Sequence, residues 1–234
     1  MTNKDLDKLV YNLSLNFCFE SNVYIFQTMT PLGRMIIAAS EEHLYLSEFV
    51  SCPTIEQEFR TISSILKCQY LQEKTDLISA TIKQLREYFY GYRKYFELPI
   101  NMIGTNFQKS VWKSLMKIPF GQTVSYFDVA NNLGKSGAGI SVGQALRKNK
   151  LAIFVPCHRV IGKNRNLVGY NAGLWRKQNL IQRESLFEFK DSSKWSWVVI
   201  LTDPSSVLAT GQWLAWKLWA LSAATLSFDF IFKW

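Results

Sequence analysis

The sequence predicts an α/β protein in two parts: a small antiparallel sheet with helices, then a helical domain of helix-turn-helix type. Short segments rich in branched and aromatic residues lie between residues 23 and 49, as is typical of strands. Apolar residues at helical spacing follow from residue 53. A hydrophobic content of 48% over 234 residues excludes a disordered chain and is sufficient for one large or two small cores.

Three strands are expected first, at Val23–Thr30, Gly33–Ser40 and His43–Phe49. The turn-forming residues between them predict an antiparallel meander. Helices are expected next at Pro53–Lys67 and Thr75–Tyr90, the second with one apolar stripe. We interpret residues 1–100 as a scaffold domain.

Residues 101–188 are expected to form a second domain that begins with a helix at Phe107–Ile118. Ser125 and Asp128 form a capping-box-like start, and Gly134 supplies a left-handed stop. A second short helix is expected at about Gly139–Lys148. The pair predicts a helix-turn-helix, a motif that also occurs in proteins that bind no nucleic acid.

The charge favours a polyanionic partner. The chain carries a net charge of +9, all of it within residues 1–190, and the sequence pI is about 9.4. Five basic residues surround the second helix, which favours phosphate contacts: Lys135, Arg147, Lys148, Lys150 and Lys163. An ordinary basic protein is the alternative on charge alone.

The segment LAIFVPCHRVIG places a thiol in an apolar setting. Leu151–Val155 is too short for a helix and predicts a buried strand that Pro156 ends. Cys157 would then stand at the end of a strand, and His158 would act on it through a turn or a bridging water. A free thiol with a pKa of about 8.5 needs a basic or positive neighbour to become a nucleophile. Alone, this pattern also fits an inert buried cysteine.

Three stretches change that balance: FGQTVSY at Phe120–Tyr126, PCHRV at Pro156–Val160 and GYNAGLWRKQNLIQRE at Gly169–Glu184. Together they resemble the O6-alkylguanine-DNA alkyltransferases, closely over residues 107–184 and loosely over 23–96. The resemblance implies a ribonuclease H-like first domain and a winged helix-turn-helix second domain. It implies the activity of a methylated-DNA–protein-cysteine methyltransferase: one irreversible transfer of an alkyl group from O6-alkylguanine, or from O4-alkylthymine, to Cys157, without a cofactor.

The resemblance also implies the catalytic residues. Glu184 would hold and polarise His158, and His158 would take the proton of Cys157 through water, as in a catalytic triad. Asn149 would fix the turn that carries the thiol.

Further residues are implied to bind the DNA. Family members press the second helix into the minor groove and turn the damaged guanine out into a pocket. Tyr126 would crowd the phosphate and protect the leaving ring nitrogen, Arg147 would contact a phosphate, and the Val160 backbone would read the base. Tyr170 and Asn171 would lie on the loop that edges the base.

Ile140 departs from the family pattern, because most relatives insert an arginine at the equivalent position. An apolar wedge can fill a base stack, but it cannot hydrogen-bond the orphaned cytosine. We therefore expect weaker base flipping.

Three other functions stay open at this stage. A binding module that recognises alkylguanine without transfer would lack the thiol, and a cysteine hydrolase would turn over repeatedly and need an oxyanion motif. A regulator would need polar side chains on the second helix to read the major groove, where glycine and alanine dominate.

The cysteines and histidines predict no closed zinc site, because no CxxC pair occurs and His43 and His158 are the only histidines. The charged start of the chain is unlike a secretory signal. We therefore expect a cytoplasmic monomer with reduced thiols, which binds double-stranded DNA carrying O6-alkylguanine and no obligate protein partner.

Residues 189–234 lie outside the resemblance and contain six of the eight tryptophans. Val207–Phe228 approaches the length of a membrane span, although its polar residues argue against one, and a surface-lying or partner-bound helix is an alternative. An extension from a shifted reading frame is another. We assign this tail no role and expect no membrane association.

Overall fold

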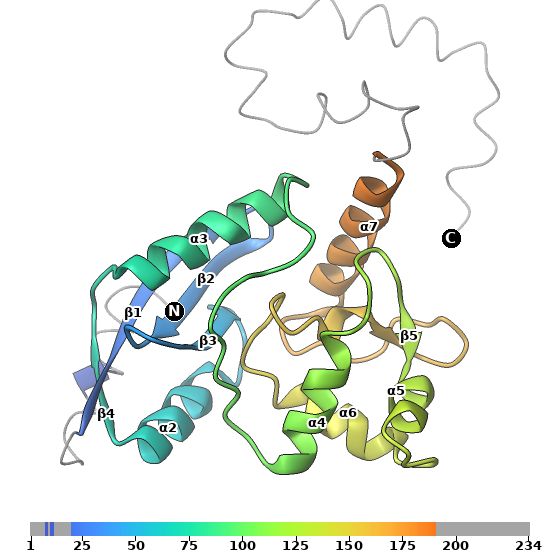
Figure 1. The fold of residues 1–234 in the computed structure, drawn as a ribbon, viewed down its shortest axis with the longest axis horizontal. Helices are drawn as coiled ribbons and strands as arrows, with labels where there is room; N and C mark the ends of the chain where they lie inside the picture. The colour runs from blue at the N-terminus through green and yellow to red at the C-terminus, as the bar shows by residue number, and fades with distance from the viewer. Residues whose placement is uncertain (1–7, 9, 12–19, 191–234) are drawn as a thin grey trace, which may run out of the picture. The chain divides into compact units, whose positions relative to one another are not determined.

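The computed structural model describes residues 8, 10–11 and 20–190 (Figure 1). The first half contains a four-stranded sheet in the order β3-β2-β1-β4. Its strands are β1 (Ser21–Thr30), β2 (Gly33–Ala39), β3 (Leu44–Phe49) and β4 (Cys68–Leu71). The predicted antiparallel meander is confirmed. The sheet is nevertheless mixed, because β4, which the sequence did not reveal, pairs parallel with β1.

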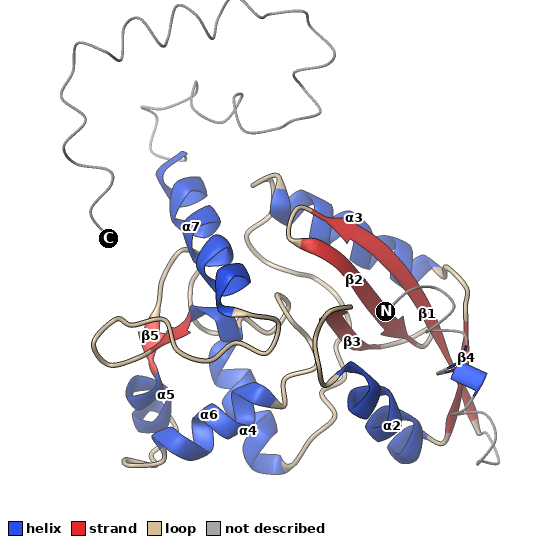
Figure 2. Ribbon diagram, turned by 180° about the vertical axis from the view of Figure 1, so that it is seen from behind, coloured by secondary structure: helices blue, strands red, loops and turns tan. Residues whose placement is uncertain are grey.

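Two helices cover this sheet, α2 (Ile55–Leu66) and α3 (Asp76–Phe89), as predicted (Figure 2). Alternate residues of β2 pack into two separate hydrophobic cores. Met35 and Ile37 pack in the cluster that contains the buried residues of α3, whereas Ile36 packs in the cluster that contains those of α2. The helices therefore lie on opposite faces of the sheet, because successive side chains of a strand point to opposite sides.

The second half is helical: α4 (Asn106–Leu115), α5 (Tyr126–Asn132), α6 (Gly139–Arg147) and α7 (Leu174–Lys190). Capping boxes start α4 and α5, and Gly134 adopts a φ of +66° after α5. Helices α5 and α6 form the predicted helix-turn-helix. A short parallel pair, β5 (Val124–Ser125) and β6 (Val160–Ile161), lies beside them, and the wing implied by the resemblance stays a prediction.

The predicted strand at Leu151–Val155 is wrong. The segment is buried throughout, but it makes only isolated bridges and folds back on itself, with the Val155 amide donating to the Leu151 carbonyl at 2.8 Å. Ile153 has a φ of +75°. Cys157 opens a short 3-10 turn, η1 (Cys157–Arg159), rather than ending a strand. A short apolar run indicates burial but does not distinguish a strand from a buried turn.

The segment before the thiol is joined to the edge of the sheet. The Ser47 amide donates to the Lys150 carbonyl at 2.9 Å, and the Ala152 amide donates to the Ser47 carbonyl at 2.7 Å. The described residues up to position 188 form one compact unit, and the domain boundary at residue 100 stays a prediction. None of the described helices is long and apolar enough to span a membrane. The expectations for the tail fall outside the described residues.

Candidate active site

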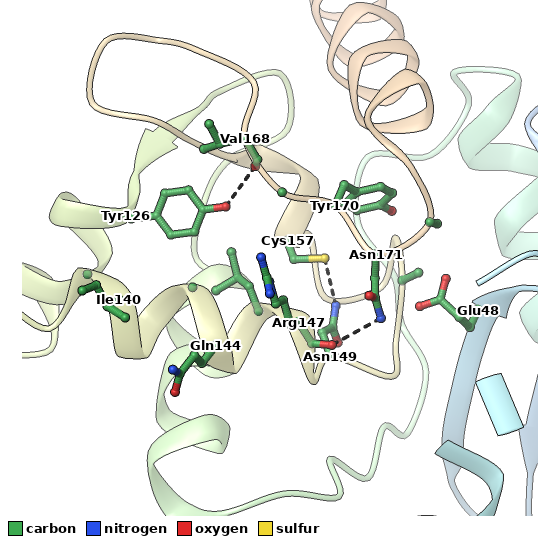
Figure 3. Close-up of a pocket in the computed structure, with 16 residues that line it drawn as sticks. Glu48, Tyr126, Ile140, Gln144, Arg147, Asn149, Cys157, Val168, Tyr170 and Asn171 are labelled. Carbon is green, nitrogen blue, oxygen red and sulfur yellow. Dashed lines mark hydrogen bonds between the residues drawn. The ribbon is translucent and has the colours of Figure 1, made fainter. Parts of the chain in front are cut away.

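A pocket of about 440 Å³ opens between α6, β3 and the loop that precedes α7 (Figure 3). Cys157 lies in its wall and is 8% exposed, so the thiol is accessible from the pocket. Six of the sequence-predicted site residues line it together: Tyr126, Ile140, Arg147, Asn149, Tyr170 and Asn171. These residues come from positions 126 to 171 of the sequence, and the fold brings them to one cavity.

Asn149 holds the thiol-bearing turn in the way that the resemblance implied. Its Nδ2 donates to the Val155 carbonyl at 3.0 Å and to Cys157 Sγ at 3.2 Å. Its Oδ1 accepts from the Leu151 amide at 3.0 Å. One buried side chain therefore ties both arms of the turn and also contacts the sulfur.

Burial raises the pKa of the Cys157 thiol to about 11, although the Asn149 hydrogen bond acts in the opposite direction. At neutral pH the sulfur is therefore protonated, and a nucleophilic role requires a base.

A neutral imidazole lies behind the thiol. Burial lowers the pKa of His158, against the opposing effect of Glu184. His158 Nε2 lies 2.8 Å from Glu184 Oε1, and an ionised carboxylate only accepts hydrogen bonds. We therefore assign the proton to Nε2, which leaves the lone pair on Nδ1. His158 Nδ1 is buried and makes no hydrogen bond within the described part of the chain.

Glu184 is the centre of a buried network. Arg159 donates to both carboxylate oxygens, at 2.8 and 2.9 Å, Tyr88 Oη donates at 2.7 Å, and the Gly121 amide donates at 3.1 Å. Burial alone would raise the pKa of Glu184, but His158 and Arg159 hold it well below its usual range. The carboxylate is thus ionised and fixes the orientation of the imidazole.

The network contains residues that sequence reasoning did not identify. Arg159 follows His158 directly, and its guanidinium contacts Glu184 and the Ile118 carbonyl. Tyr88 comes from α3 in the first half of the chain, and no local spacing relates it to residue 184.

Lys177 is another residue of the site that sequence reasoning did not identify. It is fully buried, and its Nζ donates to the carbonyls of Val168 at 2.7 Å and Gly169 at 3.1 Å. Burial lowers its pKa to about 8, with Cys157 acting in the opposite direction. Tyr126 Oη donates to the same Val168 carbonyl at 3.1 Å. Lys177 and Tyr126 thus hold the loop that forms one wall of the pocket.

The remaining predicted residues lie on α6, on the loop before α7 and in β6. Ile140 is 82% exposed on α6, and Arg147 is exposed on the same helix. Asn171 Nδ2 donates to Thr54 Oγ1 at 2.8 Å and to the Arg147 carbonyl at 3.3 Å.

Two other predicted residues are buried. Tyr170 Oη is buried with no hydrogen-bond partner among the described residues. Val160 is buried next to η1 in β6, and its side chain lies apart from the pocket lining.

Comparison with known proteins agrees with this geometry. The model of the ribonuclease-like domain of 6-O-methylguanine DNA methyltransferase matches residues 23–102, and that of its DNA-binding domain matches residues 106–186. The constitutive methylated-DNA–protein-cysteine methyltransferase of Bacillus subtilis is 43% identical over 144 residues, which cover 60% of this chain and 82% of the relative. The chain belongs to the 6-O-methylguanine DNA methyltransferase family.

Other members of this methyltransferase family show the same extent of similarity. The Methanosarcina acetivorans relative is 37% identical over 155 residues, covering 66% of this chain and 94% of the relative. The crystal structure of Mycobacterium tuberculosis OGT in complex with DNA superposes with a TM-score of 0.61 at 32% identity, covering 70% of this chain and 94% of that chain. The matched domains of the methyltransferase family end at residue 186, before the tail.

Proposed function

We propose that this protein repairs DNA by one irreversible transfer of a methyl or small alkyl group from O6 of guanine to Cys157. One observation carries the proposal: the Cys157 thiol lines an open pocket, contacts Asn149 and is followed by the buried His158–Glu184 pair. Family membership supports the same reaction, since the curated relatives are named methylated-DNA–protein-cysteine methyltransferases.

The reaction begins with the Cys157 proton, which passes through water to His158 Nδ1. The resulting imidazolium is stabilised by the ionised Glu184, which Tyr88, Gly121 and Arg159 hold in place. The thiolate attacks the alkyl carbon in line, so that an S–C bond forms as the C–O6 bond breaks. The electron pair stays with the guanine, and the Tyr126 hydroxyl turns from the Val168 carbonyl to donate a hydrogen bond to the guanine ring nitrogen. A thioether has no facile leaving reaction, so each chain acts once.

Double-stranded DNA is the proposed partner, and α6 is the proposed contact. Exposed Ile140 and Arg147 lie on this helix at the pocket, which suits a base turned out of the duplex. Phosphate contacts from Arg147 and its basic neighbours would supply salt-dependent affinity. A binding-only function is not favoured, because the acceptor thiol is present and accessible.

Mass spectrometry tests the reaction directly. After the protein is mixed with a duplex oligonucleotide that contains one O6-methylguanine, we expect a single gain of about 14 Da on the peptide with Cys157, as methyl-for-hydrogen replacement at a nucleophilic thiol requires. One equivalent of DNA should exhaust the protein. Continued turnover, or a gain on another residue, would contradict the proposal.

Replacing Ile140 with arginine should strengthen base flipping. The new side chain can hydrogen-bond the orphaned cytosine, and one such contact corresponds to about a tenfold faster transfer from duplex DNA at subsaturating protein. Transfer from the free O6-methylguanine base should be unchanged, because it needs no flipping. Ile65→Arg on α2, where Ile65 is 58% exposed, adds the same charge elsewhere and should not accelerate transfer. Equal acceleration in both variants would indicate general electrostatics instead of a wedge.

A further inference from the structure

A second group of reactive side chains lies beside the pocket and takes no part in the proposed reaction. Glu48 on β3, Cys52 in the following turn and Glu58 on α2 place one oxygen, one sulfur and one oxygen within 4.8 Å of one another. All three are buried, at 2%, 2% and 5% exposure. Glu48 also lines the Cys157 pocket (Figure 3), so the cluster and the acceptor site share a wall.

The hydrogen bonds of the cluster are incomplete. Glu58 Oε1 accepts from Thr54 Oγ1 at 2.8 Å, whereas Glu58 Oε2 is buried and has no partner among the described residues. Glu48 Oε1 accepts from the backbone amide of Phe49 at 2.8 Å. An unsatisfied buried acceptor is costly, and a buried carboxylate more so. The cluster therefore presents an acceptor that a bound cation would satisfy.

Two cationic side chains, Lys150 and Arg176, act electrostatically on the cluster from nearby, and both donate hydrogen bonds to backbone carbonyls. Lys150 Nζ donates to the carbonyls of Ile103 and Lys148. Arg176 donates to the carbonyls of Leu32 and Ala172. Burial raises the pKa of Glu58 to about 7, whereas the hydrogen bond from Thr54 and the charge of Lys150 act in the opposite direction.

We propose that Glu48, Cys52 and Glu58 bind one thiophilic divalent cation of the zinc class, through two carboxylate oxygens and one thiolate. Zinc accepts this ligand set in tetrahedral geometry, in which ligand atoms lie about 3.5 Å apart. The ligand atoms of the cluster lie within 4.8 Å of one another. On binding, the cation forms one metal–sulfur and two metal–oxygen bonds, and the proton of Cys52 and any proton held by Glu48 or Glu58 are released to solvent. The fourth ligand position is left for water.

The expectation of no closed zinc site rested on cysteine and histidine spacing, which does not register a site made of two glutamates and one cysteine.

Cobalt titration of the chelator-treated full chain tests the proposal. Co²⁺ bound to a thiolate gives an intense near-ultraviolet charge-transfer band, which carboxylate and imidazole ligands do not give. We expect the band to saturate at one equivalent and to be displaced by Zn²⁺. Cys52→Ser should remove the band, and Glu58→Gln should retain it but weaken Co²⁺ binding by at least about tenfold.

Two cysteine variants serve as matched controls. Cys68→Ser changes another buried cysteine, which lies in β4, and Cys157→Ser changes the acceptor; both variants should keep the band. Far-ultraviolet circular dichroism of each metal-free variant verifies the fold. No band in the parent chain, a band that survives Cys52→Ser, or a band lost only in Cys157→Ser would overturn the proposal. The cobalt titration does not depend on alkyl transfer, which mass spectrometry measures separately.

Discussion

Cys157→Ala is expected to abolish alkyl transfer from duplex DNA, a loss of at least about 10⁴-fold, because no other group in the pocket can form the S–C bond. Binding of the same duplex should persist, since the exposed face of α6 is unchanged. The alanine also removes an acceptor for Asn149 Nδ2, which keeps its bond to the Val155 carbonyl, so the turn should stay folded. Radiolabel uptake measures transfer, and fluorescence anisotropy measures binding.

Cys68→Ala is the matched control for this experiment. Cys68 is buried in β4 and does not line the pocket, and burial raises the pKa of its thiol to about 11, as it does for Cys157. Equal transfer by Cys68→Ala and the parent chain would show that position in the pocket, rather than thiol chemistry alone, selects the acceptor. Persistent uptake by Cys157→Ala would refute the assignment.

Glu184→Gln is expected to have the largest effect on stability, lowering the free energy of unfolding by about 3–5 kcal/mol. The substitution keeps the shape of the side chain but leaves Arg159 buried without its anionic partner. It also removes the charge that stabilises protonated His158, so transfer should slow by about 10²–10⁴-fold. Urea denaturation gives the stability, and single-turnover kinetics gives the rate.

The pH dependence of stability supplies a second measure of Glu184. Its pKa in the folded protein lies well below the ordinary value of 4.5. As the pH falls, Glu184 therefore takes up a proton in the unfolded chain before it does so in the folded protein. The stabilisation that ionised Glu184 gives to the folded protein is complete above about pH 4.5 and declines below it. The difference in the free energy of unfolding between the parent chain and Glu184→Gln should therefore become smaller as the pH falls below about 4.5.

Glu56→Gln provides the control for both measurements. Glu56 pairs with Arg60 at 2.6 Å on the exposed surface of α2, where an ion pair contributes less than about 1 kcal/mol. Glu56→Gln should leave the transfer rate unchanged. If Glu184→Gln proved as stable as Glu56→Gln, the buried network would not be the source of stability that we infer.

Local features of the fold were predictable because they depend on residues close in the chain. The Ser125–Asp128 capping box starts α5 as expected, and the alternating, turn-bounded segments of the first half form the meander. Leu151–Val155 was mispredicted because five apolar residues satisfy the requirements of a strand and of a buried turn equally. The turn forms here because Asn149 hydrogen-bonds both of its arms, a contact that hydrophobicity does not encode.

By itself, the sequence determined the family, the acceptor Cys157 and the helix-turn-helix that precedes it, because each is written in contiguous residues. Only the tertiary structure decided what surrounds the acceptor. Tyr88 donates a hydrogen bond to Glu184 across 96 positions of the sequence. Lys177 is buried beside the pocket, and Glu48, Cys52 and Glu58 come together next to it. Hydrogen bonds, burial and shared charge depend on distance in space. The folded chain sets that distance, and separation along the sequence does not.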